Sequence, residues 1–369
     1  MISFHLSPAC SHAGGGKDAS EISTMVRTHY VYCILTVLCM TMQSCSLIYD
    51  DLKNCGHDYK IVYKMRLKVQ LSTDLKEQLN AEADKPVREA LQSKMNSIFT
   101  NHAKDIDITF YNADPNKQTY RNHFFVNDST TELTLYMRVD NYTNLAVANI
   151  DDNNMVAHVD TAQVTTRLMQ MVADTVSPHN TGIFTSRLPL SVQDTAGNQS
   201  FESVLYMANS AVALLIENSN VETAGVSAYV TGMADGLMIA DSIYLFDNNI
   251  PVRMENVQLT ASSANPMARK SGKASLTPQK LLFSTVCFPS SDIATSDNGI
   301  WQVVAHVKMP DDKIVETFLS INTPLEAGRL RVIRTQMQTD GTLVPIGATD
   351  VGATVDFDWT PGGEYNPEI

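Results

Sequence analysis

The sequence lacks the short motifs that identify the common classes of enzyme. It contains no Gly-x-Ser-x-Gly nucleophile elbow, no His-Glu-x-x-His pair, no Walker loop and no Gly-x-Gly-x-x-Gly turn. The six histidines after residue 44 are scattered rather than paired at the spacing of metal ligands. Each is expected to be a surface or hydrogen-bonded core residue: His57, His102, His123, His158, His179 and His306. The sequence therefore predicts a protein that is not an enzyme, without cofactor or metal. A hydrolase built from scattered residues is the weaker alternative.

Cysteine is scarce. The chain has six, and a leader ending at residue 44 would leave only Cys45, Cys55 and Cys287. No CxxC pair exists, so zinc-ribbon and thioredoxin chemistry have no basis in the sequence. If Cys45 is modified, only Cys55 and Cys287 can form a disulfide, which an oxidising compartment permits. Two unpaired thiols are the alternative.

Basic residues are too few to balance the acidic ones, and the formal net charge is −13. Binding to nucleic acid calls for clustered lysine and arginine along phosphates, and docking on anionic lipid calls for a basic patch. The composition argues against both. At 44% hydrophobic residues, the chain can still build cores of ordinary domain size.

No apolar run is long enough for a stable membrane span, which needs about 20 residues. The apolar stretch from Tyr30 to Met42 is shorter, follows Arg27 and His29, and lies in a segment without acidic residues. This pattern indicates a secretory signal, with residues 1–44 as leader and Met25 as a better start. Cys45 directly after Ser44 predicts a lipoprotein whose acyl chains give lasting membrane attachment. Cleavage near Ser44 without lipid, or an uncleaved anchor, is the alternative.

Alternating apolar and polar residues dominate the remaining chain and predict a mostly β protein. A tether over 45–57 leads into a first strand in which Tyr59, Ile61 and Tyr63 share one face. Many short strands separated by turns favour β-sandwiches, and the polar segment around 194–200 suggests domains 58–197 and 198–369. Helical spacing of apolar residues predicts one helix at 86–101 and a second, short one at 161–177. Further strands are expected at 106–110, 119–126, 131–138, 144–150, 182–192, 202–217, 225–233, 242–246, 254–260, 280–287, 300–308, 314–321, 328–338 and 351–358.

Two other segments and a set of aromatic residues each allow a functional and a structural interpretation. The oxygen-rich stretch Asn149–Asn154 is a turn or a calcium loop, and it lacks the spacing of an EF-hand. The apolar run Val204–Ile216 is a central buried strand, or an open edge that accepts a strand from a neighbour. The aromatic residues belong to the core or form a platform for stacking on sugars: Trp301, Trp359, Tyr206, Tyr229 and Tyr244.

Four stretches resemble a known family. The segment Cys45–Cys55, which reads Cys-Ser-Leu-Ile-Tyr-Asp-Asp-Leu-Lys-Asn-Cys, is similar to the N-terminal signature of the FimB/Mfa-type fimbrial anchor lipoproteins of Bacteroides-like bacteria. Shorter similarities lie at Leu145–Asn149, Gly182–Pro189 and Asp358–Pro367, so the resemblance covers the whole chain after the leader.

The resemblance implies two tandem transthyretin-like β-sandwich domains and a structural role. The protein would sit on the outer membrane, lipid-anchored at the base of a fimbrium, and hold fimbrial subunits that join by strand exchange. It would support fimbrial assembly or limit fimbrial length. Cys45 would be the acylated anchor, and Asp50 and Asp51 would assist export to the cell surface. A surface lipoprotein that binds glycans is the alternative function.

Overall fold

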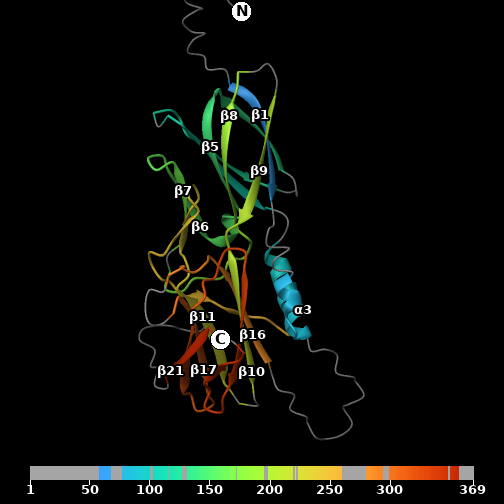
Figure 1. The fold of residues 1–369 in the computed structure, drawn as a ribbon, viewed down its shortest axis with the longest axis vertical. Coiled ribbons are helices and arrows are strands. Elements are labelled where there is room, and N and C mark those ends of the chain that lie inside the picture. The colour runs from blue at the N-terminus through green and yellow to red at the C-terminus, as the bar shows by residue number, and fades with distance from the viewer. Residues whose placement is uncertain are drawn as a thin grey trace, which may run out of the picture. The chain divides into compact units, whose positions relative to one another are not determined.

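The computed structural model confirms a mostly β protein (Figure 1). It describes residues 58–67, 77–99, 103–114, 116–126, 131–171, 173–194, 198–218, 221, 223–259, 280–293, 299–347 and 350–356. Cys45, Asp50, Asp51, Cys55 and Trp359 lie outside these residues, so every prediction that rests on them stays a prediction. In the described part, no helix is long and apolar enough to cross a membrane.

The first sheet has seven strands in the order β3-β2-β5-β8-β9-β1-β4. Its strands are β1 (Asp58–Leu67), β2 (Asp105–Asn112), β3 (Tyr120–Phe125), β4 (Thr131–Arg138), β5 (Asp140–Ala148), β8 (Phe184–Val192) and β9 (Gln199–Met207). All pairs with a defined register are antiparallel except β1 with β9, which is parallel. The strand expected to begin at 144 begins at Asp140 instead.

Two segments with family resemblance meet in this sheet. Leu145–Ala148 lies in β5 and Phe184–Pro189 in the neighbouring β8. Asn149 follows β5 with a positive φ of 66°, which asparagine tolerates better than most residues. Its side chain accepts from Lys104 N at 2.8 Å and donates to Gly182 O at 2.6 Å. Asn149 therefore fastens the end of β5 to the start of the β8 segment.

Two five-stranded sheets form a sandwich in the second half of the described chain. One has the order β15-β16-β10-β19-β20 and the other β14-β11-β17-β18-β21. Val212 and Leu214 of β10 share one buried cluster with Val303 and Val307 of β17, so the two sheets enclose a common core. Their strands are β10 (Ser210–Asn218), β11 (Gly225–Thr231), β14 (Val252–Arg253), β15 (Glu255–Asn256), β16 (Lys280–Cys287), β17 (Trp301–Lys308), β18 (Ile314–Ile321), β19 (Leu330–Met337), β20 (Leu343–Pro345) and β21 (Val351–Asp356).

The predicted first helix is confirmed as α3 (Lys85–Ile98). Pro86 fits its first turn, where the missing N–H costs nothing. The buried face of α3 belongs to the same core cluster as Ala213 and Leu215 of β10, and Figure 1 shows α3 beside β16. Lys94 pairs with Glu255 at 2.6 Å, and Asp84, just before the helix, with Lys280 at 2.5 Å. The helix thus attaches to the first of the two sandwich sheets.

Strand β10 is buried on both faces. Successive residues of a strand point to opposite sides, so Val212, Leu214 and Ile216 enter the sandwich core while Ala213 and Leu215 enter the core beneath α3. Both edges of β10 are paired, with β16 and β19. The interpretation as a central strand is therefore confirmed for 210–216, and the open-edge alternative is wrong there.

The expected strand at 202–217 is two strands in two sheets. β9 ends at Met207 and β10 begins at Ser210, so the chain changes sheet across Ala208 and Asn209. The core beneath α3 contains residues from both sides of this point. The division into domains 58–197 and 198–369, and the tandem transthyretin-like arrangement, stay predictions.

The helix expected at 161–177 is wrong. This region forms a hairpin of β6 (Met155–Asp160) and β7 (Thr165–Gln170) in a four-stranded sheet with β12 (Gly236–Met238) and β13 (Ile243–Leu245). Thr165 and Thr166 are β-branched and buried, which suits a strand better than a helix. The pairing of Leu168 with Leu237 is a long-range contact that the local spacing of apolar residues does not reveal.

Candidate functional site

The parallel pairing of β1 with β9 joins the first described strand to a strand that lies more than 130 residues later in the sequence. It runs from Ile61 opposite Gln199 to Leu67 opposite Leu205. Because the strands are parallel, a pull on the residues before β1 and an opposite pull on those after β9 would slide the strands past one another. Hydrogen bonds that cross between the strands then resist together instead of breaking one after another. Ile61, only 1% exposed, adds the packing of a core side chain to this joint.

Asn209 lies between β9 and β10, at the point where the chain passes from the first sheet into the sandwich. The residue is fully buried. Its Oδ1 accepts from Ile183 N at 2.5 Å, its Nδ2 lies 2.6 Å from His179 Nδ1, and its backbone carbonyl accepts from Gly328 N at 2.7 Å. The side chain and carbonyl of Asn209 thus hold two separate segments, 179–183 and the one around Gly328, at the point where the chain changes sheet.

His179 is the described residue that comes nearest to a catalytic arrangement. Since Asn209 Oδ1 accepts from Ile183 N, Asn209 Nδ2 must donate to His179 Nδ1, and a neutral His179 then carries its proton on Nε2. His179 lines a cavity of about 100 Å³ together with Ser284 and Thr285. The hydroxyls of both residues, like Nε2, have no hydrogen-bond partner among the described side chains and backbone.

The protonation state of His179 decides whether it can act as a general base in this cavity. Burial lowers the pKa of His179 to about 3, so the ring is neutral near neutral pH. With its proton on Nε2, the ring cannot take a proton from Ser284 or Thr285, which a serine-type nucleophile requires. The cavity is therefore a polar space in the protein interior rather than a nucleophile–base pair.

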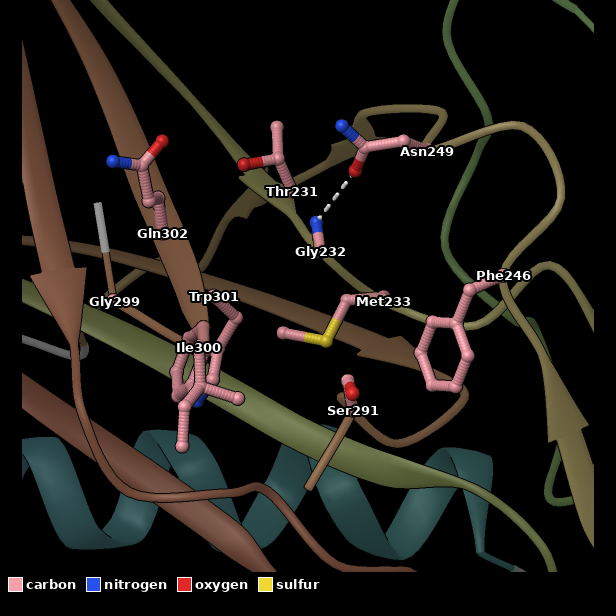
Figure 2. Close-up of a pocket in the computed structure, with 10 residues that line it drawn as sticks. All are labelled: Thr231, Gly232, Met233, Phe246, Asn249, Ser291, Gly299, Ile300, Trp301 and Gln302. Carbon is pink, nitrogen blue, oxygen red and sulfur yellow. Dashed lines mark hydrogen bonds between the residues drawn. The ribbon is translucent and has the colours of Figure 1, made fainter. Parts of the chain in front are cut away.

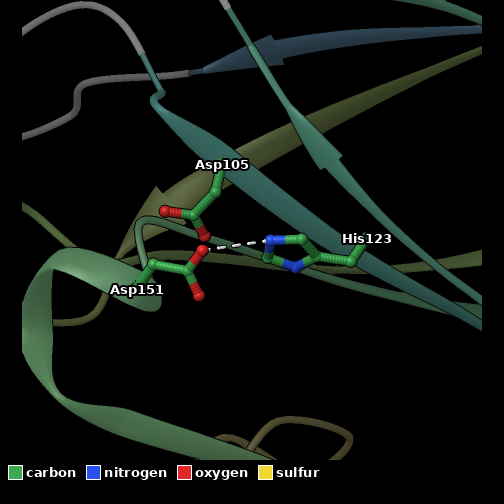
Figure 3. A group of neighbouring side chains, drawn as sticks. All are labelled: Asp105, His123 and Asp151. Carbon is green, nitrogen blue, oxygen red and sulfur yellow. Dashed lines mark ion pairs between the residues drawn. The ribbon is translucent and has the colours of Figure 1, made fainter.

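A second cluster brings together Asp105, His123 and Asp151, with ligand atoms within 4.8 Å of one another (Figure 3). The hairpin of β2 and β3 places His123 opposite Asp107, and the 3₁₀ turn η1 (Asp151–Asn153) adds Asp151. His123 Nε2 lies 3.3 Å from Asp151 Oδ2. Among the described residues, this is the group that could hold a metal ion. The three residues are far apart in the sequence, so the sequence analysis did not identify them as a cluster.

Each member of the Asp105–His123–Asp151 cluster already has a protein partner. Asp105 Oδ1 accepts from Ile150 N at 2.8 Å, and His123 pairs with Asp151. Burial, more than any other cause, raises the pKa of the Asp105 carboxyl. The hydrogen bonds and the ion pair account for the arrangement without an ion. The stretch 149–154 contains η1 between two residues of positive φ, Asn149 and Asn154, as expected of a turn.

The predicted aromatic platform does not form around Trp301. This residue is 2% exposed, belongs to the sandwich core and donates from Nε1 to Thr323 O at 2.8 Å. The core interpretation is confirmed for Trp301, and the interpretation as an exposed stacking platform is wrong because the residue is almost fully buried. Tyr244 packs against Phe288, and Tyr229 against His306.

Cys287 is a free thiol in this structure and is 1% exposed within the sandwich core. Burial raises its pKa to about 12, so the thiol is neutral and unreactive near neutral pH. Since Cys55 lies outside the described residues, the disulfide between the two stays a prediction.

The chain is similar to proteins of one known family. Residues 63–273 match the family described as fimbrillin-A associated anchor proteins Mfa1 and Mfa2. No curated protein matches the sequence. Solved structures to which the chain is similar include the fimbrial anchor protein Mfa2 from Porphyromonas gingivalis, at 9% identity and a TM-score of 0.45, covering 81% of this chain and 98% of that one. Another is a fimbrial assembly protein from Parabacteroides distasonis, at 13% identity and a TM-score of 0.37, covering 81% and 99%.

Proposed function

The chain belongs to the family of fimbrillin-A associated anchor proteins, and we propose that it is a lipoprotein that holds a fimbrium at the cell surface and supports its assembly or length control. The family is structural and not enzymatic, and membership indicates a fimbria-associated location. The lipid, the outer membrane and the contact with fimbrial subunits are the proposed parts.

The parallel pairing of β1 with β9 carries this proposal. An anchor must pass tension from its membrane end to its fimbrial end. The tether enters the fold at β1, and β9 continues through Asn209 into the sandwich. Tension between the tether and the sandwich therefore loads β1 and β9 in opposite directions along their length. A short strand pair resists separation best under this shear loading, because its hydrogen bonds must break together.

Cys45 is the proposed site of acylation, with Asp50 and Asp51 close behind it as an export signal. Two or three acyl chains are expected to hold the protein lastingly, whereas one chain gives only marginal binding. Labelling of cells with radioactive palmitate tests this part. Label should enter the wild-type chain and be absent from Cys45→Ala. Equal label in both, or none in the wild type, contradicts it.

The fimbrial subunit is proposed to add a strand along β21. Among the described strands, β21 is the longest that lies at a sheet edge after Asn209, and it pairs with β18 only. Gly352 and Ala353 are exposed there and leave room for an approaching backbone. A subunit bound at this edge would load the sandwich and, through β10, the joint of β9 with β1.

A photo-crosslinking residue at Thr354 tests this partner site. Thr354 is exposed on β21, and Thr134 is a matched control, exposed on the edge strand β4 of the first sheet. Crosslinks to a fimbrial subunit are expected from position 354 and not from 134. Crosslinks from 134 alone would move the contact to the first sheet, and none from either would reject strand addition at both edges.

A further inference from the structure

A cavity of about 500 Å³ opens at one end of the sandwich (Figure 2). It lies where β11 ends at Thr231, where the chain enters β17 at Trp301, and beside the loop after β13 that carries Phe246 and Asn249. Its size is within the range of about 300–1,000 Å³ that is typical of small-molecule sites. Neither the proposed tether nor the proposed strand contact uses it.

The described lining residues are apolar on one part of the cavity and polar on another, and none of them is charged. Met233 and Trp301 are almost fully buried and form the floor with Ile300, while the ring of Phe246, 41% exposed, lies across from them. The uncharged polar residues of the lining are Thr231, Asn249, Ser291 and Gln302. In a chain of net charge −13, no acidic or basic side chain is among the lining residues that the structure describes. Among these described residues an ionic ligand would find no counter-charge, and burial of an unpaired charge is costly.

The polar groups are held in place before any ligand arrives. Asn249 has a positive φ of 45°, and its Oδ1 accepts from Gly232 N at 3.0 Å, so its Nδ2 remains the donor of the amide. Gln302 Nε2 donates to Ser320 Oγ at 3.0 Å, so its Oε1 remains an acceptor. Groups fixed in this way lose little freedom on binding, which favours affinity.

Glycine is required where the two loops meet. Gly232 has a φ of 80°, and a Cβ added there would lie 3.0 Å from Ile300 O. The close approach of these backbones brings the end of β11 against the start of β17 and forms the wall between Thr231 and Trp301. The cavity is thus a shaped feature of the fold rather than a gap between mobile side chains.

We propose that this cavity binds one unit of a neutral carbohydrate. A hexose ring has an apolar face of C–H groups that suits Phe246, and hydroxyls that both donate and accept, as Gln302 Oε1 and Asn249 Nδ2 require. This site differs from the stacking platform expected on Trp301, since the exposed ring is Phe246 and Trp301 lies beneath.

Binding of the full mature chain to an array of neutral and acidic oligosaccharides tests the proposal, followed by calorimetric titration of the best neutral saccharide. Phe246→Ala is expected to weaken binding about tenfold through loss of the aromatic contact. Asn249→Asp keeps the acceptor for Gly232 N and removes the Nδ2 donor, so it should also weaken binding. Phe125→Ala is the matched control, because Phe125 is 77% exposed on β3, outside the cavity.

The proposal is overturned if no neutral saccharide binds, if only acidic ones bind, or if Phe125→Ala weakens binding as much as Phe246→Ala does. Thermal melting of each variant identifies one that does not fold, and Asn249→Asp, which changes no side-chain volume appreciably, then decides the outcome.

Discussion

Replacing Ile61 by alanine tests whether the pairing of β1 with β9 carries tension. Ile61 of β1 is 1% exposed and belongs to a buried core cluster. Truncating a buried isoleucine to alanine costs about 2–5 kcal/mol of unfolding free energy. Ile108 of β2 is a matched control, because it is 0% exposed in the same core cluster but lies three strands away from β9.

Both variants should therefore lose similar stability in urea, yet differ under force. The chain is pulled between an N-terminal handle and a cysteine placed at Gly225, which is exposed and has nothing within 4 Å of an added Cβ. Cys45 and Cys55 are replaced by serine in this background, while Cys287 is buried and stays. This geometry applies tension to β1 on one side and to β9, through β10, on the other.

At constant force, the lifetime of the β1–β9 joint is the measured quantity. A loss of 2 kcal/mol from the rupture barrier shortens it about 30-fold, since each 1.4 kcal/mol is a factor of about ten. Ile61→Ala should show this shortening, and Ile108→Ala should stay close to the wild type. Equal shortening in the two variants would mean that the sheet fails as a whole, and no shortening in Ile61→Ala would mean that tension bypasses β1. Either result refutes the reasoning.

Three further predictions follow from titratable groups in the interior. Burial raises the pKa of Asp105, so its ionisation destabilises the fold as the pH rises through the native-state value. Asp105→Asn should accordingly raise the melting temperature at pH 7 and change it little at pH 3, and a lower melting temperature at pH 7 would contradict this. His179, with its pKa lowered to about 3, stays neutral in the fold while the unfolded chain takes up a proton below about pH 6.5. Its share of the unfolding free energy should therefore fall by about 1.4 kcal/mol per pH unit as the pH drops, and His179→Gln should flatten the measured slope; an unchanged slope would show that His179 is not the group responsible. Cys287 should resist iodoacetamide in the native protein and react after unfolding without reductant; no reaction until reductant is added would instead support its disulfide with Cys55.

The strands whose bounds were predicted correctly are those that can be recognised from their own residues and the turns beside them. The bounds of β16 at 280–287 and β18 at 314–321 agree with the prediction, because each is a run of apolar and β-branched residues set off by polar or turn residues. The helix α3 was predicted for the same kind of reason. Its apolar residues recur at helical spacing after Pro86, and the buried residues are those of that face.

The errors arose where distant residues decide the structure. The segment around Leu168 has apolar spacing compatible with a helix, but pairing with β12 makes it a strand. Asn209 interrupts an otherwise continuous apolar run, because its side chain bonds to Ile183 and His179. Neither partner can be assigned from the local sequence.

The candidate sites depend on distant contacts for the same reason. The cavity beside Phe246 is lined from segments that extend from Thr231 to Gln302, so only the folded sheets bring them together. The sequence predicts both β2 and β3 as strands. The Asp105–His123–Asp151 cluster, however, forms only with the particular register of their hairpin, which the sequence does not give. In contrast, family membership could be predicted from short contiguous motifs, since these are features of the sequence itself.

Deletion of the gene, with fimbriae counted on cells and in the cell-free medium, tests the anchoring role most directly. The account predicts that fimbriae leave the cells and collect in the medium, or that those retained change in length, and that the wild-type gene restores them. Fimbriae that stay on the deletion strain in normal number and length would contradict it.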